Sequence, residues 1–405
     1  MNVKHRQVRF AVMLAMFSAL GPFTVDMYLA SFPQIMKSFG TNASMIQASL
    51  TTGMLGLSLG QIITGALSDV HGRRKPLLIA MFLYFISSLG CAFSPNIRTF
   101  IVLRFIEGFV ASAGLVISRA IVRDQYTGVE LTKFYSLLTM ISSVSPLVSP
   151  LAGGAVISFV PWIGVFIFLA IFGVFLTTLT KWGIKETLPE ERRVSSNFMG
   201  LLKNYYTLIR NRTFMGYALV SGLFMAGVFA YVSGSSFIYQ KIYGVSPQLF
   251  SVLFALNGIG LMLSSQFVKK LAGRMARRTI LQIGLSSGFI MSVAVLLVVL
   301  SHGPLFALVI SLFLFNASNG IIGPMCFTLA IESQGHVAGS ASALLGILPF
   351  LLGSITSPLV GMAGEFSALP FGVIIFTTTV CCVVVYVSLV KKAEPLTSST
   401  RAKAL

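Results

Sequence analysis

Three ionisable residues lie inside stretches that otherwise resemble membrane-spanning helices. Asp26 is the only charged residue of the stretch 10–36, and Arg104 and Glu107 share another apolar stretch. A carboxylate inside a bilayer costs roughly 2.5–3.5 kcal/mol on insertion scales and usually serves a function. A spacing of three puts Arg104 and Glu107 on one helix face. Together the three residues could bind and release a proton, because burial disfavours the Asp26 carboxylate and Arg104 favours it. The alternatives are a structural, hydrogen-bonded acid and a self-satisfied Arg104–Glu107 pair.

Composition places these residues in a membrane protein. Of the 405 residues, 55% are hydrophobic and 10% are charged, whereas soluble domains carry about 25% charged residues. We expect an all-α membrane protein whose twelve transmembrane helices form two six-helix, pseudo-symmetric bundles. Helices of this kind cross a hydrocarbon core of about 30 Å. The expected spans are 10–34, 46–67, 77–94, 99–121, 134–157, 161–182, 214–239, 248–268, 279–300, 304–328, 338–361 and 369–390.

The basic residues are distributed unevenly between the loops. Most of the 29 lie in segments that share one side of the membrane, whereas the other side holds Lys37, Arg98 and Lys241. The positive-inside rule therefore predicts that both termini are cytoplasmic. Topology and anionic lipid account for the net charge of +18, so we expect no nucleic-acid partner. The N-terminal apolar run is too long for a signal peptide and is predicted to be a retained first helix.

The remaining chemistry-bearing residues predict no cofactor. The four cysteines have neither metal-ligand spacing nor histidine partners, which indicates packing thiols. No GxxxxGK[ST] phosphate loop occurs, so ATP bound by this chain is not expected to supply energy. We expect no catalytic residue and no metal, with protons as the coupling ion. The cysteines are Cys91, Cys326, Cys381 and Cys382.

A polar segment divides the spans six and six. The sequence Ser149-Pro150-Leu151-Ala152-Gly153 recurs as Ser357-Pro358-Leu359-Val360-Gly361, and the basic pair at 73–74 recurs at 277–278 with a nearly equal offset. Repeats of this kind place a substrate site near the midplane between two halves. The predicted parts are an N-terminal bundle over 1–182, a cytoplasmic linker over 183–213, a C-terminal bundle over 214–392 and a cytoplasmic tail over 393–405.

The loop after the second span combines glycines with charges. Gly65 allows close helix approach and Gly72 allows a sharp turn. Asp69 can accept bonds from the start of the next helix, and Arg73 and Arg74 can bond the last carbonyls of a neighbouring helix. The pattern predicts a conformational latch between helices, with a basic topology loop as the alternative.

The fifth span contains two prolines four residues apart, followed by paired glycines. Pro150 lacks a donor for the helix ladder and its ring clashes with the carbonyl of Pro146. A helix with Gly153 and Gly154 after this kink should bend and pack closely. We predict that these residues form a conformational switch with the loop after the second span; an ordinary kinked helix is the alternative.

These motifs resemble those of a known family. The loop after the second span is similar to the major facilitator superfamily signature, GxLaDrxGrkxxl. The run around Arg104 resembles the superfamily's span-4 motif, whose arginine is implicated in proton transfer, and the fifth span resembles its antiporter motif. The chain departs from these motifs at Glu107, where Gln is usual, and at Ser149, where the first Gly is usual. The first departure leaves open how many protons are handled and whether substrates are cationic.

The first helix narrows the resemblance. Asp26-Met27-Tyr28-Leu29 followed by a proline is similar to the first helix of the bicyclomycin/chloramphenicol-resistance (Bcr/CflA) drug exporters, as are residues 118–124 and 338–344, Trp162 with Phe166, and Glu186-Thr187. The resemblance implies a monomer in the bacterial cytoplasmic membrane that performs proton-coupled efflux of small lipophilic or amphiphilic compounds, such as chloramphenicol or bicyclomycin. The alternatives are an exporter of one metabolite, such as an amino-acid derivative or sugar, a passive facilitator, and a transporter-derived sensor.

A substrate wall is also expected. A few polar groups on an apolar, aromatic lining suit lipophilic amphiphiles. The expected contacts are Tyr28, Phe224, Tyr231, Phe237, Asn257, Asn316 and Asn319.

Overall fold

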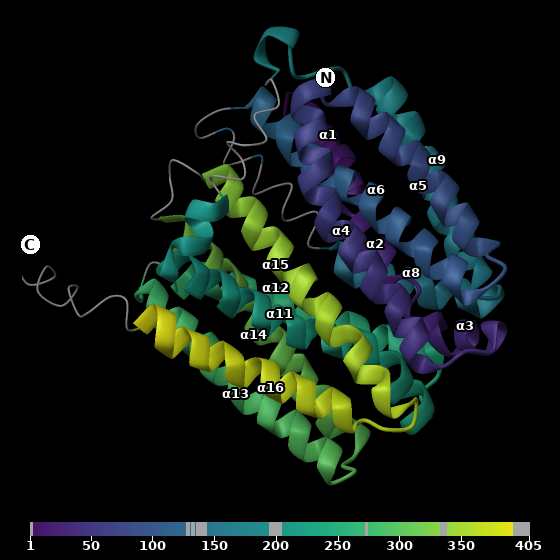
Figure 1. The fold of residues 1–405 in the computed structure, drawn as a ribbon, viewed down its shortest axis with the longest axis vertical. Helices are drawn as coiled ribbons and strands as arrows, with labels where there is room; N and C mark the ends of the chain where they lie inside the picture. Colours follow the sequence, from purple (N-terminus) through teal and green to yellow (C-terminus); the bar gives the residue numbers. More distant parts are fainter. Residues whose placement is uncertain are drawn as a thin grey trace, which may run out of the picture. The chain divides into compact units, whose positions relative to one another are not determined.

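The computed structural model is built from helices (Figure 1). It describes residues 3–126, 130, 134, 144–193, 205–271, 274–332 and 338–391. Within these ranges, 11 helices are long and apolar enough to cross a membrane, and the shorter apolar helix α8 (Ser145–Phe159) lies where the fifth span is expected. The all-α membrane architecture predicted from composition is therefore confirmed. Parts of the predicted fifth span and linker, and the whole predicted tail, lie outside the described residues.

The first span is broken into short pieces, because two prolines interrupt it. Helix α1 (Val3–Ser18) ends four residues before Pro22, which has no N–H to bond the Ser18 carbonyl. Helix α2 (Leu20–Asp26) is followed by a turn and the short 3-10 helix η1 (Leu29–Ser31). Helix α3 (Phe32–Phe39) then carries Pro33 in its first turn, where proline is tolerated. The chain is therefore irregular at the midpoint of this span.

The other helices are more regular. Asn42 and Asn96 cap the starts of α4 and α6 by accepting bonds from the backbone N–H groups of Met45 at 3.0 Å and Thr99 at 2.9 Å. In chain order the remaining elements are α4 (Ala43–His71), α5 (Arg74–Ala92), α6 (Ile97–Gln125), α8, α9 (Ile163–Gly183), η2 (Glu190–Arg192), α11 (Arg212–Phe237), η3 (Ile238–Ile242), α12 (Pro247–Leu271), α13 (Arg277–Leu300), α14 (Leu305–Glu332), α15 (Ala338–Val360), η5 (Gly361–Ala363), α16 (Leu369–Val385) and η6 (Tyr386–Lys391).

The chain divides into two compact units that do not follow the two sequence halves. Unit 1 comprises 1–196, 229–259 and 354–371, and unit 2 comprises 197–228, 260–353 and 372–405. Unit 1 therefore combines the first six helices with parts of α11, α12 and α15 from the second half of the chain.

Inside unit 1, glycines allow the helices to pack closely, and polar side chains form hydrogen bonds between elements. A side chain at Gly56 or Gly108 would overlap the backbone of the facing helix, so α4 and α6 approach closely. The Gln240 amide donates to the Ala30 carbonyl at 3.1 Å, and the Ser44 hydroxyl donates to the Gly361 carbonyl at 3.0 Å. Residues from both sequence halves thus meet at the end of unit 1 where α4 begins.

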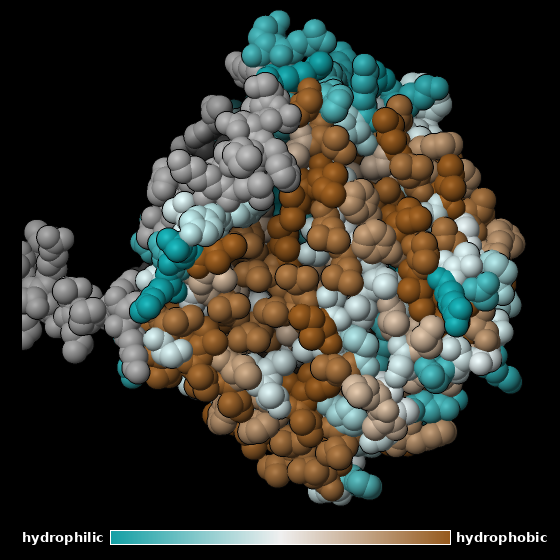
Figure 2. Space-filling model, viewed as in Figure 1, coloured by the Kyte–Doolittle hydropathy of each residue, from teal (hydrophilic) through white to brown (hydrophobic). Residues whose placement is uncertain are grey.

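Unit 2 presents an apolar outer surface. Leu351 on α15 and Val373 and Val384 on α16 are all exposed. Figure 2 shows apolar side chains covering the visible face along these helices, with hydrophilic residues gathered mainly near helix ends. An apolar surface of this kind suits contact with lipid hydrocarbon.

Candidate functional site

The break in the first span positions Asp26 at the last residue of α2. The last carbonyls of a helix lack intrahelical partners and carry partial negative charge. The Asp26 side chain is half-buried, and its described hydrogen-bond partner is the Ser149 hydroxyl, which donates to Oδ2 at 3.5 Å. Both the helix end and the partial burial oppose a negative charge, so this carboxylate is suited to holding a proton.

Helix α8 packs against the same break. A Cβ atom at Gly153 would overlap the carbonyl of Met27, and one at Gly154 would overlap the Ser251 side chain of α12. The glycines therefore let α8 approach both the first span and α12 inside unit 1. The kinked helix predicted from Pro146 and Pro150 thus presents Ser149, the departure from the antiporter motif, to Asp26.

Arg104 is fully buried and bonds to two parts of unit 1. Its guanidinium forms an ion pair with Glu107 on the same helix and donates to the carbonyl of Thr24 at 2.6 Å. It also lies over the Tyr28 ring, with Cζ 4.1 Å from the centroid. Because Thr24 belongs to the last turn of α2, Arg104 satisfies one of the carbonyls that the broken helix leaves open.

Glu107 is held from several sides. It is fully buried, accepts a hydrogen bond from the Ser88 hydroxyl at 2.6 Å, and has the Cys91 thiol at 3.9 Å. Its pairing with Arg104 matches the alternative of a self-satisfied Arg104–Glu107 pair. Among the described ion pairs, none includes Asp26. The shared helix face between Arg104 and Glu107 was readable from their spacing; the bond from Arg104 to α2 was not.

The residues of the predicted latch after the second span lie at and just beyond the C-terminal end of α4. Arg73 is buried, bonds Asp69 and Asp124, and reaches the Asp124 carboxylate at 2.8 Å. Arg74 donates to the carbonyl of Lys181 at 2.6 Å. Burial alone would lower the pKa of Arg73, but its bonds to Asp124 and Asp69 outweigh burial and raise it. Gly65 faces the Val116 side chain of α6. This network ties α4, α5, α6 and α9 together.

Glu186 contributes to this network although the sequence assigned it no role. Its carboxylate accepts bonds from the backbone N–H groups of Arg73 at 2.8 Å and Arg74 at 3.1 Å. Gly72, at φ +84°, leaves room for it, since a Cβ there would lie 2.5 Å from Oε2. Burial opposes the charge, but backbone N–H donors, led by Arg73 and Leu188, outweigh it and lower the pKa of Glu186. The carboxylate therefore caps the start of α5.

Asp124 is the second residue that sequence reasoning left without a role. Its carboxylate forms an ion pair with the Arg73 guanidinium and accepts a hydrogen bond from the Thr187 hydroxyl at 3.2 Å. The available signal was an acid at the end of the fourth span, on the side where the basic loop lies. Asp124 near the end of α6 and Glu186-Thr187 in the segment after α9 thus bind the loop residues from two parts of the chain.

Four of the predicted substrate contacts lie in unit 1. Tyr28 is fully buried and its hydroxyl lies 3.2 Å from the Ser49 hydroxyl. Tyr231 is buried and accepts a bond from the Asn257 amide at 2.7 Å. Phe237 packs on Phe32, with ring centroids 5.8 Å apart. Tyr231 and Asn257 therefore form a hydrogen-bonded pair in unit 1, the unit that also contains Asp26.

The other three predicted contacts lie in unit 2. Phe224 stacks on Phe315 with centroids 4.8 Å apart. Asn316 donates to the carbonyl of Leu312 at 2.8 Å, and Asn319 donates to the Met225 sulfur at 3.4 Å. The structure thus separates the predicted wall into two groups, one in each unit.

Comparisons with known proteins point to one family. The family described as Major Facilitator Superfamily matches residues 12–358. The chain is 48% identical to an MFS-type transporter of Bacillus subtilis (strain 168), YdgK, over 95% of this chain and 96% of the relative. It is 28% identical to a bicyclomycin resistance protein homolog of Haemophilus influenzae, over 95% and 96% respectively. The crystal structure of the nucleoside transporter NupG matches with a TM-score of 0.76 at 11% identity, covering 96% of this chain and 100% of that one, which shows the shared fold.

Proposed function

The chain belongs to the major facilitator superfamily, and from that premise we propose that it exports small lipophilic or amphiphilic compounds in exchange for protons, as its similarity to a bicyclomycin resistance protein homolog supports. The protein is a transporter rather than an enzyme. The observation that carries the proposal is the half-buried Asp26 carboxylate at the break of the first span, which has Ser149 as its described donor and takes part in no described ion pair.

Asp26 is the proposed proton-coupling site. Protonation removes a negative charge that the end of α2 and partial burial both oppose. In alternating access, Asp26 would gain a proton from outside and release it inside, and substrate would bind the deprotonated form. Tyr231 and Asn257 are bonded to each other in the same unit as Asp26, so we propose that substrate and proton occupy neighbouring parts of this unit.

The Arg104–Glu107 pair has a different proposed role. Arg104 holds the carbonyl of Thr24 at the last turn of α2, two residues before Asp26. We assign the pair to holding the broken helix in place, with its net charge near zero. Its contribution to coupling is therefore through the position of Asp26 rather than through a second proton.

One proton supplies enough free energy for this exchange. Moving one charge down about 100 mV yields roughly 2.3 kcal/mol, and one pH unit adds about 1.4 kcal/mol. Since about 1.4 kcal/mol corresponds to a tenfold ratio, the sum supports a gradient of several hundred-fold for a neutral substrate. An additional titrating acid is not required by this balance.

The decisive measurement is uptake into inside-out vesicles driven by a pH gradient, for wild type and Asp26→Asn. The substrates come from a resistance panel in a pump-deficient bacterium that includes chloramphenicol and bicyclomycin. We expect Asp26→Asn to abolish uptake driven by the gradient. The matched control is Glu191→Gln, the same acid-to-amide change at an exposed residue outside the spans.

Persistence of gradient-driven uptake in Asp26→Asn would reject the role of Asp26. If the uptake rate of the wild type does not depend on the pH gradient, the protein is instead a passive facilitator. Resistance to a single compound would favour a dedicated exporter. If Glu107 interacts with the charge of the substrate, Glu107→Gln should reduce the transport of cationic substrates more than that of neutral ones, with rates normalised to the amount of folded protein. An equal loss for both kinds of substrate would reject this role of Glu107.

A further inference from the structure

Unit 2 contains a groove that the proposed transport cycle does not use. It lies between α13 and the end of the last span, is open on one side, has a volume of about 380 Å³, and is lined mainly by apolar side chains. Its volume falls in the range of about 300–1,000 Å³ that is typical of small-molecule sites. Gln282, Ser286, Phe289 and Ile290 on its rim are exposed, so in a membrane the groove opens toward lipid.

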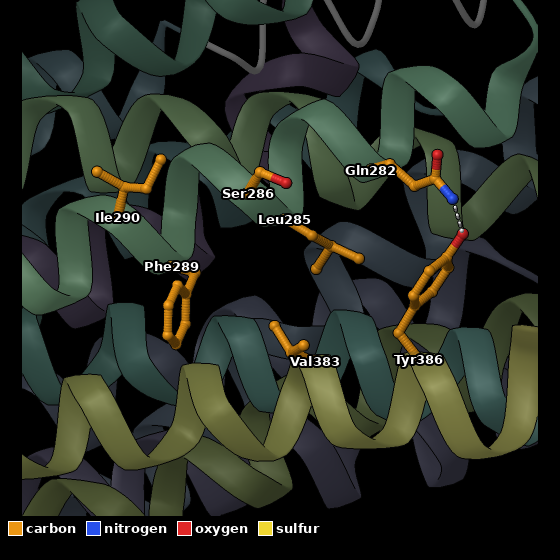
Figure 3. Close-up of a pocket in the computed structure, with 7 residues that line it drawn as sticks. All are labelled: Gln282, Leu285, Ser286, Phe289, Ile290, Val383 and Tyr386. Carbon is orange, nitrogen blue, oxygen red and sulfur yellow. Dashed lines mark hydrogen bonds between the residues drawn. The ribbon is translucent and has the colours of Figure 1, made fainter.

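The groove has one polar end and one apolar end. Figure 3 shows Gln282 and Tyr386 together at one end, with Phe289 and Ile290 at the other. The Gln282 amide donates to the Tyr386 hydroxyl at 3.1 Å, and Phe289 packs toward Phe376 with centroids 6.2 Å apart. Gln282 and Ile290 are eight residues apart, about 12 Å along the helix. The groove therefore matches a phospholipid whose headgroup lies at the polar end and whose acyl chain lies along the apolar end.

The polar end can still form hydrogen bonds. A glutamine amide has two donors and an acceptor oxygen with two lone pairs, and the bond to Tyr386 uses one donor. Polar groups that face hydrocarbon without partners are costly. A phosphate or glycerol oxygen bound at Gln282 and Tyr386 would satisfy these polar groups. Acyl chains alone would leave them without hydrogen-bond partners, which costs free energy.

Basic residues flank the polar end. Arg277 and Arg278 begin α13 five and four residues before Gln282, and Lys391 ends η6 five residues after Tyr386. Lys391 lies just over one turn beyond Tyr386 in the π-helical η6, and π-helical turns are frequent at functional sites. Arg277 is balanced by Glu332 at 3.0 Å, whereas Lys391 is exposed. The local charge favours an anionic headgroup.

We propose that this groove binds one anionic phospholipid, with its headgroup at Gln282, Tyr386 and Lys391 and an acyl chain between α13 and α16. The residues involved all belong to unit 2, and none of them is assigned to proton coupling or substrate contact. The proposal is therefore independent of the proposed function.

Native mass spectrometry of the full-length protein, titrated with phosphatidylglycerol or phosphatidylcholine, tests the site. We expect one phosphatidylglycerol to be retained more tightly than phosphatidylcholine. Ser286→Trp should fill the groove and remove the retained lipid, whereas Ser301→Trp, the same change just beyond the end of α13, should leave it. Equal retention of the two lipids by wild type, or unchanged retention by Ser286→Trp, would overturn the proposal.

A surface variant keeps the test valid if the tryptophan disturbs folding. Lys391→Gln should weaken phosphatidylglycerol retention about fivefold, the share of one lysine beside an anionic surface, and leave phosphatidylcholine unchanged. Lys270→Gln, at an exposed position on α12, is the matched control. Equal effects of the two lysine substitutions would show only general charge attraction and reject the site. Displacement of the lipid by an exported drug at equal concentration would identify the groove as a substrate site and also reject it.

Discussion

Asp26 and Glu107 are both carboxylates in the first half of the chain, but their surroundings are opposite. Asp26 is half-buried, with Ser149 at 3.5 Å as its described hydrogen-bond donor. Glu107 is fully buried, bonded to Ser88 at 2.6 Å and paired with Arg104. A carboxylate in an ion pair loses much more on protonation than one held by a single long bond. This difference supports the proposal that Asp26 exchanges protons and that Glu107 has a structural role.

The strongest way to break this comparison is to remove Arg104. We expect Arg104→Met to lower the free energy of unfolding by about 3–5 kcal/mol, because it leaves a buried carboxylate unpaired and opens the carbonyl of Thr24. Thermal unfolding in detergent measures the loss. Arg104→Met combined with Glu107→Leu should recover most of it, since apolar replacement of a whole buried pair is often neutral. A double variant no more stable than the single one would contradict the structural role.

Neutralising each acid in turn sharpens the contrast. Glu107→Gln should cost roughly 1.5–3 kcal/mol of stability, the range for a hydrogen bond to a charged group, whereas Asp26→Asn should cost at most about 1 kcal/mol, the worth of one ordinary hydrogen bond. The transport effects should run the other way, with gradient-driven uptake lost in Asp26→Asn. Unfolding curves and vesicle uptake are compared on the same preparations. If Asp26→Asn proves the more destabilising of the two, the assignment is reversed.

Ser149 tests whether the hydrogen bond to Asp26 contributes to transport. Ser149→Ala removes a bond worth about 1 kcal/mol, so we expect uptake to fall roughly fivefold at most. Initial rates in inside-out vesicles measure the change. Ser145→Ala, in the first turn of the same helix, should have no effect on the rate. An unchanged rate in Ser149→Ala would place Asp26 outside the influence of this helix.

Substitution of Glu186 should give the smallest change in stability, and this residue takes no part in the described contacts of Asp26 and Glu107. Its pKa is lowered in the folded protein, so its stabilising contribution is present above its unfolded pKa of about 4.3 and disappears as the pH falls through the folded value. We expect Glu186→Gln to lower stability by about 0.3–1 kcal/mol near neutral pH, with the difference from wild type vanishing in acid. Unfolding measured from pH 7 down to pH 3 follows this. A difference that persists at the lowest pH would exclude a charge effect.

Much of the fold was readable from residue types. Apolar runs predicted the spans, and Pro22 and Pro33 mark the pieces into which the first span breaks. The loop glycines and charges identified a cluster, but the carboxylate that fills the space beside Gly72 comes from residue 186, beyond the sixth span. Local patterns report backbone preference and polarity, and they carry no information on which distant segment approaches.

The sequence by itself determined the membrane class, the family and the acids that chemistry could use, because hydrophobicity, proline and intramembrane charge act through each residue alone. Tertiary structure decided which acid has which partner. Arg104 could have paired with either carboxylate, and its position under the end of α2 gave it Glu107 and the Thr24 carbonyl instead of Asp26. That choice depends on how α6 packs against a broken helix 80 residues away in sequence, which no local rule contains.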